Sequence, residues 1–369
     1  MKIKYDYQIF ASQKFGGISK YFVYMINELK NTQCKPIVLA PLHINHHLNN
    51  QISSKNKFGL FLNTKSRIFK RLIKYFNFFF DFLISVFSNY QIIHLTYFSV
   101  ISGSYIDKKS KMVITVHDMT YEKFPFLFKN PKKTIEAKKK LIKKADSIIA
   151  VSNNTKKDLL KYYNIESKKI NVIYHGVDFS IFYKKNYIKN IVHDKKYILY
   201  VGNRDGYKNF IKLLEVFSET SLLNNNYNLI LFGGEKLSNI EKQLIKKSSI
   251  QNKIYQISGN DNLLCKYYNQ ASVFVSTSLY EGFGMTILES MACECPVIAG
   301  NNSSIPEISG GGVCLVDMTK KEDLSYALNK VLYDENYKNK LISLGLNNAK
   351  KFNWSITAKK TYDLYKSLI

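Results

Sequence analysis

The stretch Ser278–Gly300, SLYEGFGMTILESMACECPVIAG, has residue types and spacing that could bind a phosphate flanked by hydroxyl groups. Glu281 precedes a Gly-Phe-Gly turn, and a helix is predicted to begin near Met285. The N–H groups of a first helical turn lack intrahelical acceptors and, with the helix dipole, attract an anion. Glu281 and Glu289 could accept hydrogen bonds from hydroxyls beside that anion, as a nucleotide sugar would require. The simpler alternative is a helix whose acidic residues only stabilise its dipole.

A second loop, Val201–Asn209 (VGNRDGYKN), follows a predicted strand and opens a predicted helix, where a phosphate-binding loop would lie. Arg204 offers a planar fork for two oxygens and Lys208 a compact charge, so this pair could neutralise a diphosphate. Only three of the 54 basic residues are Arg, which favours a functional interpretation of Arg204. A solvated basic turn is the alternative.

Two loops in the first half of the chain also follow predicted strands. Gly16 and Gly17, in KFGGISKYF, would let backbone N–H groups approach a ligand closely. His117 and Asp118, in VITVHDMTY, come just past the end of a predicted strand. Ligands of parallel α/β sheets bind beyond the carboxyl ends of the strands, so both loops are candidate site elements.

The sequence contains no Asp-x-Asp pair, which enzymes that hold a nucleotide diphosphate through a divalent cation often use. We therefore expect no metal and no cofactor. Arg204, Lys208 and a helix N-terminus would have to balance the diphosphate charge instead. The five Cys include no C-x-x-C pair, so we expect reduced thiols rather than a zinc site or a disulfide framework.

Short apolar, β-branched runs alternate with helical stretches along both halves, which indicates parallel α/β sheets. Strands are expected at Ile3–Phe10, Pro36–Ala40, Gln91–Leu95, Met112–Val116, Ser147–Val151, Asn171–Tyr174, Tyr197–Val201, Leu229–Phe232, Val273–Ser276, Val297–Ala299 and Val313–Val316. A polar, aperiodic stretch over residues 179–196 is a candidate linker. The predicted fold is therefore α/β, with two doubly wound, Rossmann-like domains, residues 1–178 and 197–352, facing a central cleft.

The chain has 369 residues and a formal net charge of +26, and this charge is uneven. Residues 1–190 hold 33 basic and 11 acidic side chains, whereas the remainder is nearly neutral. A helix predicted over Lys65–Ser88 has a basic start, up to Lys74, and an aromatic end. Such a helix can lie in a membrane interface and face anionic lipid. A core-facing helix with a solvated basic face is the alternative. No apolar run is long enough to span a bilayer, and no signal-peptide pattern is present.

In combination these motifs resemble the retaining glycosyltransferases of family 4, which have the GT-B fold. The resemblance covers nearly the whole chain, through GGISKYF, VHDMTY, KADSIIAVSN with INVIYHGVD, VGNRDGYKN, the Ser278–Gly300 stretch, SSIPE and the closing FNW helix. The N-terminal YDYQIF…QKFGGISKYF is similar to the bacterial branch that builds lipopolysaccharide and capsule, often from mannose donors.

The resemblance implies a role for each candidate residue. The catalytic residues would be Glu281 and His117. The donor diphosphate would be bound by Arg204, Lys208, Gly17, Thr286 and Ile287, the ribose by Glu289, and the donor sugar by Phe283, Gly284 and Met285. The acceptor side would include Gly16, Lys20, Tyr21 and Asp118. The family is metal-independent and retains the anomeric configuration, and its C-terminal helix, here residues 353–369, crosses back to the first domain.

The sequence therefore predicts a hexosyltransferase at the inner face of the cytoplasmic membrane. Its partners would be a nucleotide sugar, with GDP-mannose slightly favoured, a lipid-linked glycan acceptor, and an anionic membrane surface contacted by Lys65–Lys74. A soluble sugar-phosphate synthase that uses a UDP- or ADP-sugar is the alternative enzyme. A sugar-binding protein without turnover and a basic nucleic-acid-binding protein are the non-enzymatic alternatives. No helix-turn-helix, RNP or zinc-finger signature supports nucleic acid as a partner.

Overall fold

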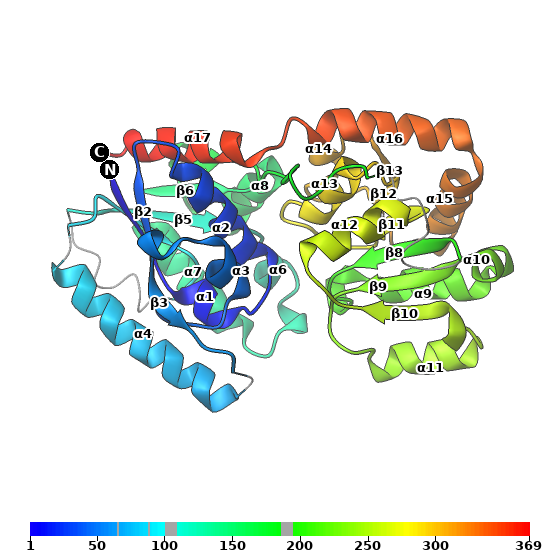
Figure 1. The fold of residues 1–369 in the computed structure, drawn as a ribbon, viewed down its shortest axis with the longest axis horizontal. Helices are drawn as coiled ribbons and strands as arrows, with labels where there is room; N and C mark the ends of the chain where they lie inside the picture. The colour runs from blue at the N-terminus through cyan, green and yellow to red at the C-terminus, as the bar shows by residue number, and fades with distance from the viewer. Residues whose placement is uncertain (65, 88, 100–108, 186–194) are drawn as a thin grey trace. The chain divides into compact units, whose positions relative to one another are not determined.

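The structure is a computed structural model that describes residues 1–64, 66–87, 89–99, 109–185 and 195–369. It divides into two compact units (Figure 1). Unit 1 comprises Met1–Gly176 together with Trp354–Ile369, and unit 2 comprises Val177–Asn353. Half of the linker predicted at residues 179–196 lies outside the described residues, because residues 186–194 are not among them.

Unit 1 is built on a seven-stranded parallel sheet with the order β3-β2-β1-β4-β5-β6-β7. Its strands are β1 (Lys2–Tyr5), β2 (Lys35–His43), β3 (Lys57–Phe61), β4 (Ile92–Leu95), β5 (Lys111–Val116), β6 (Ser147–Ala150) and β7 (Ile170–Val172). Strand order reverses between β1 and β4, which is the position where doubly wound sheets bind ligands. His117-Asp118 directly follow β5 at this carboxyl edge, whereas the short helix α1 (Gln8–Ser12) separates β1 from Gly16-Gly17.

The helices of unit 1 cover both faces of this sheet. They are α1 (Gln8–Ser12), α2 (Gly17–Leu29), α3 (His46–Gln51), α4 (Arg67–Phe87), α6 (Thr120–Lys123), α7 (Pro131–Lys144), α8 (Asn153–Tyr162) and α17 (Trp354–Lys366), with short 3-10 turns η1 (Ser54–Asn56), η2 (Pro125–Leu127) and η3 (Ser167–Lys169). The last helix, α17, packs along α2 in unit 1 (Figure 1). Thr357 in α17 donates a hydrogen bond from Oγ1 to the carbonyl of Tyr174 at 2.8 Å.

The single strand expected over Ile3–Phe10 is wrong. β1 ends at Tyr5, and the helix α1 begins at Gln8. The chain turns at Asp6, whose buried carboxylate accepts hydrogen bonds from the backbone N–H of Thr96 at 2.8 Å and from its hydroxyl at 2.6 Å. These side-chain hydrogen bonds replace the backbone hydrogen bonds that a longer strand would make. The local pattern of apolar residues gives no sign of them.

Unit 2 has a six-stranded parallel sheet with the order β10-β9-β8-β11-β12-β13. Its strands are β8 (Tyr197–Val201), β9 (Asn228–Phe232), β10 (Ile254–Ile257), β11 (Val273–Ser276), β12 (Val297–Gly300) and β13 (Val313–Val316). Its helices are α9 (Phe210–Glu219), α10 (Ser221–Asn226), α11 (Asn239–Lys247), α12 (Asp261–Gln270), α13 (Met285–Ala292), α14 (Ile305–Ser309), α15 (Lys321–Tyr333) and α16 (Glu335–Ala349), with 3-10 turns η4 (Gly206–Lys208) and η5 (Gln251–Lys253). Each unit is therefore a doubly wound α/β domain, as the alternating pattern predicted.

The helix α4 confirms the helix expected over Lys65–Ser88, although Lys65 and Ser88 themselves lie outside the described residues. Its side toward the sheet is a narrow stripe formed by Ile73, Asn77 and Asp81, all buried. Asn77 exchanges two hydrogen bonds with the backbone of Leu42, at 2.8 and 2.7 Å. Asp81 forms an ion pair with the buried Lys4 of β1 at 2.8 Å. Across the described part of the chain, no helix combines the length and apolar character that a membrane crossing needs.

Candidate active site

The Glu281-Gly-Phe-Gly284 turn lies at the carboxyl end of β11 and leads directly into α13. Gly284 is the N-cap, with φ of +108°, a left-handed conformation that non-glycine residues avoid. A Cβ at Gly284 would lie 2.9 Å from a methyl carbon of Ile308. The first intrahelical hydrogen bonds come from the N–H groups of Ile287 and Leu288, both to the Gly284 carbonyl. The N–H groups of Met285 and Thr286 therefore form the open, positive end of the helix.

The loop after β8 supplies a cation to the same turn. Lys208 Nζ lies 2.7 Å from Glu281 Oε1, and both side chains are about one-fifth exposed. Burial lowers the pKa of Lys208, but the Glu281 carboxylate, together with Tyr207 and Tyr200, outweighs burial and holds that pKa above its usual value. The backbone carbonyl of Lys208 accepts a hydrogen bond from the hydroxyl of Thr277 at 2.7 Å. A charged ammonium and a carboxylate are thus held beside a helix N-terminus.

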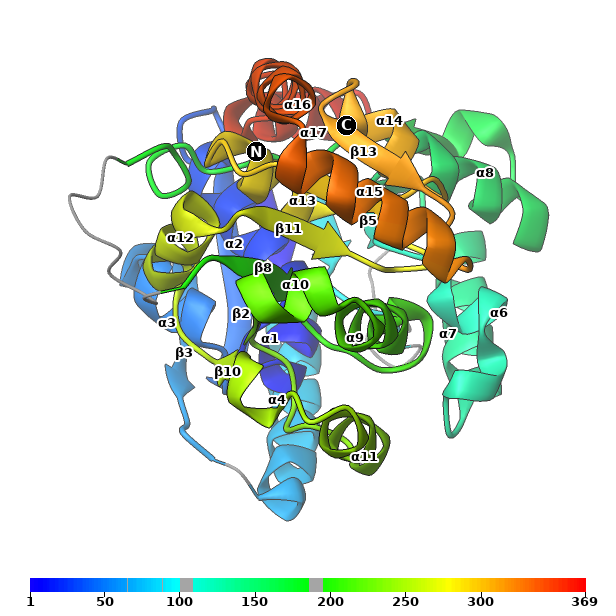
Figure 2. The same ribbon diagram turned by 90° about the vertical axis from the view of Figure 1, so that its right-hand side faces the viewer.

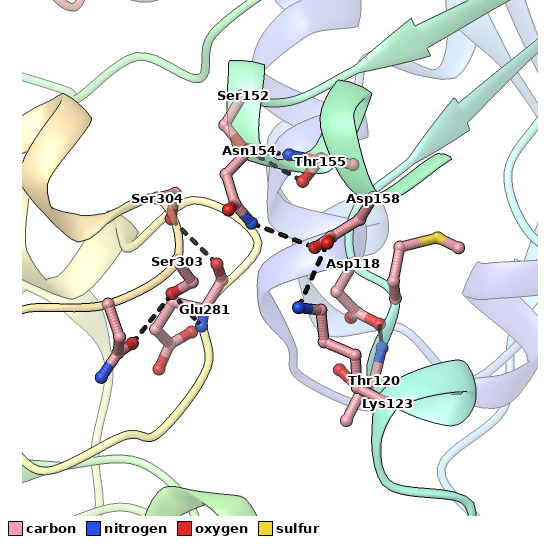
Figure 3. A network of polar contacts seen from close by, with 12 residues as sticks. Asp118, Thr120, Lys123, Ser152, Asn154, Thr155, Asp158, Glu281, Ser303 and Ser304 are labelled. Atoms are coloured by element: carbon pink, nitrogen blue, oxygen red, sulfur yellow. Dashed lines mark hydrogen bonds and ion pairs between the residues drawn. The ribbon is translucent and has the colours of Figure 1, made fainter. Parts of the chain in front are cut away.

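Two serines that sequence reasoning missed hold the turn in place (Figure 3). The backbone N–H of Glu281 donates to Ser303 Oγ at 2.9 Å. The hydroxyl of Ser304 lies 2.9 Å from the carbonyl of Glu281 and 2.8 Å from that of Phe283. In the sequence, the Ser-Ser-Ile-Pro-Glu run indicates only a resemblance to the family. Its position after β12, next to β11 in the sheet, was the signal that these serines reach the turn.

The side chain of Arg204 is 5% exposed and makes protein contacts on several sides. Its Nε donates to Glu241 Oε1 at 3.1 Å, Nη1 donates to the Gly233 carbonyl at 3.4 Å, and Nη2 donates to the Glu235 carbonyl. Glu241 also completes a capping box with Ser238 at the start of α11. Three of the five guanidinium N–H groups therefore organise the loop between β9 and α11. The predicted contact of Arg204 with a diphosphate stays a prediction.

The remaining donor-side residues lie in the same stretch. Glu289 is in the second turn of α13 and is 5% exposed. Phe283 is 3% exposed and packs its ring edge-on against Phe352, with centroids 6.0 Å apart. Ile287 is fully buried, and its N–H already donates to Gly284. The backbone N–H of Ile287 is therefore already used within the helix, and the predicted diphosphate contacts of Thr286 and Ile287 stay predictions.

In unit 1, the Gly16-Gly17 pair begins α2. Gly16 is the N-cap, and a Cβ there would lie 2.4 Å from the amide oxygen of Gln13. Ser19 closes the turn through its hydroxyl, which lies 3.0 Å from the Gly16 carbonyl. Lys20 is 8% exposed. The pair therefore opens a 13-residue helix at the carboxyl edge of β1, as the motif predicted.

Tyr21, expected on the acceptor side, lies in the core of unit 1. Its side chain is 0% exposed, with its hydroxyl 3.4 Å from Thr115 Oγ1. Its ring contacts the rings of His117 and His175, with centroids 4.9 and 4.7 Å away. Tyr21 therefore packs against both imidazoles, and its acceptor-side role stays a prediction.

His117 follows β5 and is 9% exposed. Within the described residues, neither of its ring nitrogens has a hydrogen-bond partner. Burial lowers the pKa of His117 to about 4, an effect that Asp118 opposes and Lys138 reinforces. The ring is therefore neutral at pH 7, with one donor and one acceptor nitrogen for a ligand hydroxyl or phosphate oxygen.

The backbone around Asp118 is fixed by a polar network in unit 1 (Figure 3). Asp118 Oδ1 accepts from the N–H of Thr120 at 3.0 Å, at the start of α6. Lys123, at the end of α6, forms an ion pair with Asp158 of α8 at 3.1 Å. Asp158 also accepts a hydrogen bond from Asn154 at 3.1 Å. Sequence reasoning identified Asp118 but missed this support, because α8 is far from it in the chain.

The described residues contain no group of three or more His, Cys, Asp or Glu side chains placed to hold a metal ion. Their five cysteines are free thiols. The expectation of catalysis without a metal or cofactor stays a prediction.

Two family models match the chain. Glycosyltransferase Family 4 matches residues 15–180, and Glycosyl transferases group 1 matches residues 184–348. Together they cover almost all of both units. The chain therefore belongs to the family 4 glycosyltransferases with the GT-B fold, as the motifs suggested.

Curated relatives include bacterial glycosyltransferases. An N-acetylgalactosaminyltransferase of Campylobacter jejuni that acts on a diphospho-undecaprenol-linked sugar is 29% identical, over 54% of this chain and 55% of its own. The O-antigen chain mannosyltransferase B of Escherichia coli is 32% identical, over 47% of this chain and 46% of its own. The chain spans about half the length of the curated relatives it matches.

Solved structures share the fold at low identity. Sucrose-phosphate synthase from Thermosynechococcus elongatus has a TM-score of 0.79 and 19% identity, covering 100% of this chain and 98% of its own. The Anabaena HepE protein, solved with UDP and glucose, has a TM-score of 0.78 and 14% identity, covering 100% of both chains. These likenesses confirm the predicted fold of two Rossmann-like domains.

Proposed function

We propose that this protein is a retaining glycosyltransferase that moves a hexose from a nucleotide sugar to a lipid-linked glycan in bacterial surface-polysaccharide synthesis. The observation that carries the proposal is the arrangement around α13. The helix N-terminus, the Lys208 ammonium and the Glu281 carboxylate meet at one turn. A diphosphate between two hydroxyl-bearing groups matches that arrangement in charge and in hydrogen bonding.

The chemistry follows from what these groups stabilise. When the bond from the anomeric carbon to the β-phosphate oxygen breaks, negative charge develops on the diphosphate. The N–H groups of Met285 and Thr286 and the Lys208 ammonium would stabilise that charge, which lowers the barrier. Glu281 would accept hydrogen bonds from sugar hydroxyls while it keeps Lys208 charged and in place. Glu289 would bind the ribose, and the neutral His117 would contact the donor sugar.

The substrate class is supported by the relatives. Mannosyltransferases of O-antigen chains in Escherichia coli and Salmonella typhimurium are 32% and 29% identical over the matched segments. The Campylobacter jejuni relative takes a lipid-diphosphate acceptor by name. We therefore propose a hexose donor, with GDP-mannose slightly favoured, and a lipid-linked acceptor.

The exposed side of α4 supports docking at the membrane where such acceptors reside. Its large exposed side chains are Ile68, Phe69, Leu72, Tyr75, Phe76, Phe79 and Phe82. Arg71 and Lys74 are exposed beside them. The polar Asn77 and Asp81 face the sheet, so the usual polarity of a surface helix is inverted. Aromatic rings with neighbouring cations suit the headgroup region of an anionic bilayer.

A second candidate is a soluble sugar-phosphate synthase that uses a UDP- or ADP-sugar. A probable sucrose-phosphate synthase of Thermosipho melanesiensis is 28% identical over 62% of this chain. The inverted polarity of α4 favours the membrane enzyme, because a soluble synthase has no use for an exposed aromatic helix.

A donor and acceptor panel tests the proposal. Thermal shifts with UDP, GDP and ADP identify the nucleotide, because a ligand that binds only the folded state stabilises it. Acceptor-dependent nucleotide release, with NMR of the product linkage, then tests transfer with retention. Activity only on a phosphorylated, water-soluble sugar would establish the second candidate. Nucleotide binding without release would indicate a sugar-binding protein.

A further inference from the structure

We infer that unit 1 touches the membrane at a second place, the segment from α6 to α7, through an aromatic tip and a lysine face. The inference rests on the proposed function, since it assumes that the acceptor is held in an anionic bilayer. The aromatic tip is Phe124–Phe128. The lysine face is the exposed side of α7, formed by Lys132, Lys133, Lys139, Lys140, Lys143 and Lys144.

The aromatic tip exposes apolar rings on an ordered backbone. Phe126 is 79% exposed, more than any other large apolar side chain of the described residues, and Leu127 is 39% exposed. Phe128 turns back and stacks on Tyr121, with centroids 4.1 Å apart. The N–H of Leu127 donates to the Phe124 carbonyl at 3.0 Å. The tip is therefore a preformed apolar projection, which costs little conformational entropy to insert.

The lysine face follows helical spacing. Its six lysines form three adjacent pairs, and corresponding members of the pairs are seven and then four residues apart, so they share one side of α7 with a single exposed acid, Glu136. The opposite side is buried through Lys138, Leu141 and Ile142. Six like charges on one helix face weaken the helix unless an anionic surface meets them. Each lysine near such a surface strengthens binding about fivefold at low salt.

A buried ion pair ties this segment to the candidate site. α6 and α7 lie side by side (Figure 2). Lys138 of α7 lies 2.9 Å from Glu122 of α6, with the two side chains 1% and 3% exposed. Lys138 also donates to the Asp118 carbonyl at 3.1 Å, and the Tyr163 hydroxyl donates to Glu122. The same lysine thus fixes the base of the tip and the turn that carries His117 and Asp118.

An anionic bilayer explains both features at once. Rings of the tip would lie at the boundary between headgroups and acyl chains, with the flanking lysines at the lipid phosphates. A nucleic acid would account for the lysines but would leave the projecting apolar Leu127 in water. The segment from α6 to α7 directly follows the turn that carries His117 and Asp118. A membrane bound by this segment would therefore approach that turn.

Tryptophan reporters test the inference, because the chain has a single Trp, the buried Trp354. F126W and, as a second reporter, L127W are mixed with vesicles of phosphatidylethanolamine and phosphatidylglycerol that carry a brominated lipid. We expect a blue shift and quenching for both reporters. F69W reports on α4, and Y326W, at a 68% exposed position of unit 2, is the matched control.

The outcomes separate this inference from the docking proposed for α4. Quenching of F69W without quenching of F126W and L127W would refute the second contact and leave α4 docking intact. Quenching of the tip reporters alone would support the second contact and refute α4. No quenching at either place would refute both.

Charge neutralisation tests the lysine face in the full-length protein. K139Q/K140Q/K143Q/K144Q should lower vesicle affinity by more than a hundredfold at low salt. K246Q/K247Q, on an exposed face of α11 in unit 2, should leave it unchanged. If the quadruple variant loses affinity for duplex RNA and keeps its affinity for vesicles, the face binds nucleic acid and the inference is wrong.

Discussion

Lys208 Nζ lies 2.7 Å from Glu281 Oε1, and this ion pair joins the loop after β8 to the turn that opens α13. The pair keeps an ammonium charged within reach of a helix N-terminus, where the developing charge of a leaving diphosphate would be stabilised. Glu281 is in turn held by Ser303 and Ser304. We therefore propose that donor binding depends on three neighbouring loops of unit 2 acting together.

Replacing Lys208 tests this pair. K208M removes the cation, and we expect transfer to fall about 10²- to 10³-fold, as when one group that stabilises transition-state charge is lost. Initial rates at saturating acceptor measure the change, and circular dichroism checks the fold. K212M is the matched control, because Lys212 pairs with Glu215 at 3.4 Å one turn further along and should keep normal rates. Normal rates in K208M would remove Lys208 from the site.

Arg204 and Glu241 form a buried pair that can be dissected by a double-mutant cycle. R204M and E241M should each cost about 3–5 kcal/mol of unfolding free energy, because each leaves the partner's charge buried without its counterion. The double variant should cost much less than the sum. Chemical denaturation measures all four proteins. If R204M unfolds like wild type but loses nucleotide binding, Arg204 is a direct diphosphate ligand and the loop-organising role is wrong.

Gly284 tests the geometry of the α13 N-terminus. G284A should destabilise the protein by about 1–3 kcal/mol through its φ of +108° and additionally through contact with Ile308. Thermal shifts with nucleotide should also shrink, since the anion site moves. G311A shares a positive φ of +80°, but its Cβ would meet only Leu344 at 3.6 Å. We expect G311A to lose stability but to keep its thermal shift with nucleotide. An equal loss of that thermal shift in G284A and G311A would contradict an anion site at the N-terminus of α13.

Buried histidines of unit 1 predict a pH dependence of stability. Burial lowers the pKa of His43 and His117 to about 4 and that of His94 to about 3, from 6.5. The unfolded chain therefore takes up protons first as the pH falls, and stability decreases below about pH 6.5, by roughly 1.4 kcal/mol per pH unit for each histidine. Burial raises the pKa of Asp6 to about 6, which opposes this loss only in part.

Denaturation midpoints between pH 7 and 5 measure this dependence. Burial also lowers the pKa of His175, so H43L removes one of four such histidines and should reduce the histidine part of the slope by about a quarter. A stability that is constant or rises over this range would show that the four imidazoles are not held neutral by burial.

The alternating pattern of apolar runs and helices was sufficient to predict most strands of both sheets, because buried parallel strands have continuous β-branched runs such as Met112–Val116. Strands at the sheet edges were missed: β3 and β10 are only partly buried and lack that signal. The helix α16 was missed as well, although it packs against α13. Partial burial weakens the periodic pattern on which sequence reasoning relies.

Local motifs predicted the turn at Glu281–Gly284, because glycine and helix-start chemistry are local in sequence. Long-range contacts could not be predicted. The Arg204–Glu241 pair joins residues 37 apart, and the support of Glu281 by Ser303 depends on strand order in the sheet. Tyr21 lies in a motif, yet burial beneath His117 depends on how α2 packs on the sheet. A motif identifies a residue but not the direction of its side chain.

The most direct test of the central claim is acceptor-dependent nucleotide release from GDP-mannose, with UDP- and ADP-sugars in parallel, on membrane vesicles that contain lipid-linked glycan. The account predicts that one donor releases its nucleotide only when acceptor is present, that the glycolipid gains one hexose in mass, and that K208M slows both about 10²- to 10³-fold. Vesicle binding by the folded protein, with no release from any donor and no change in glycolipid mass, would contradict it.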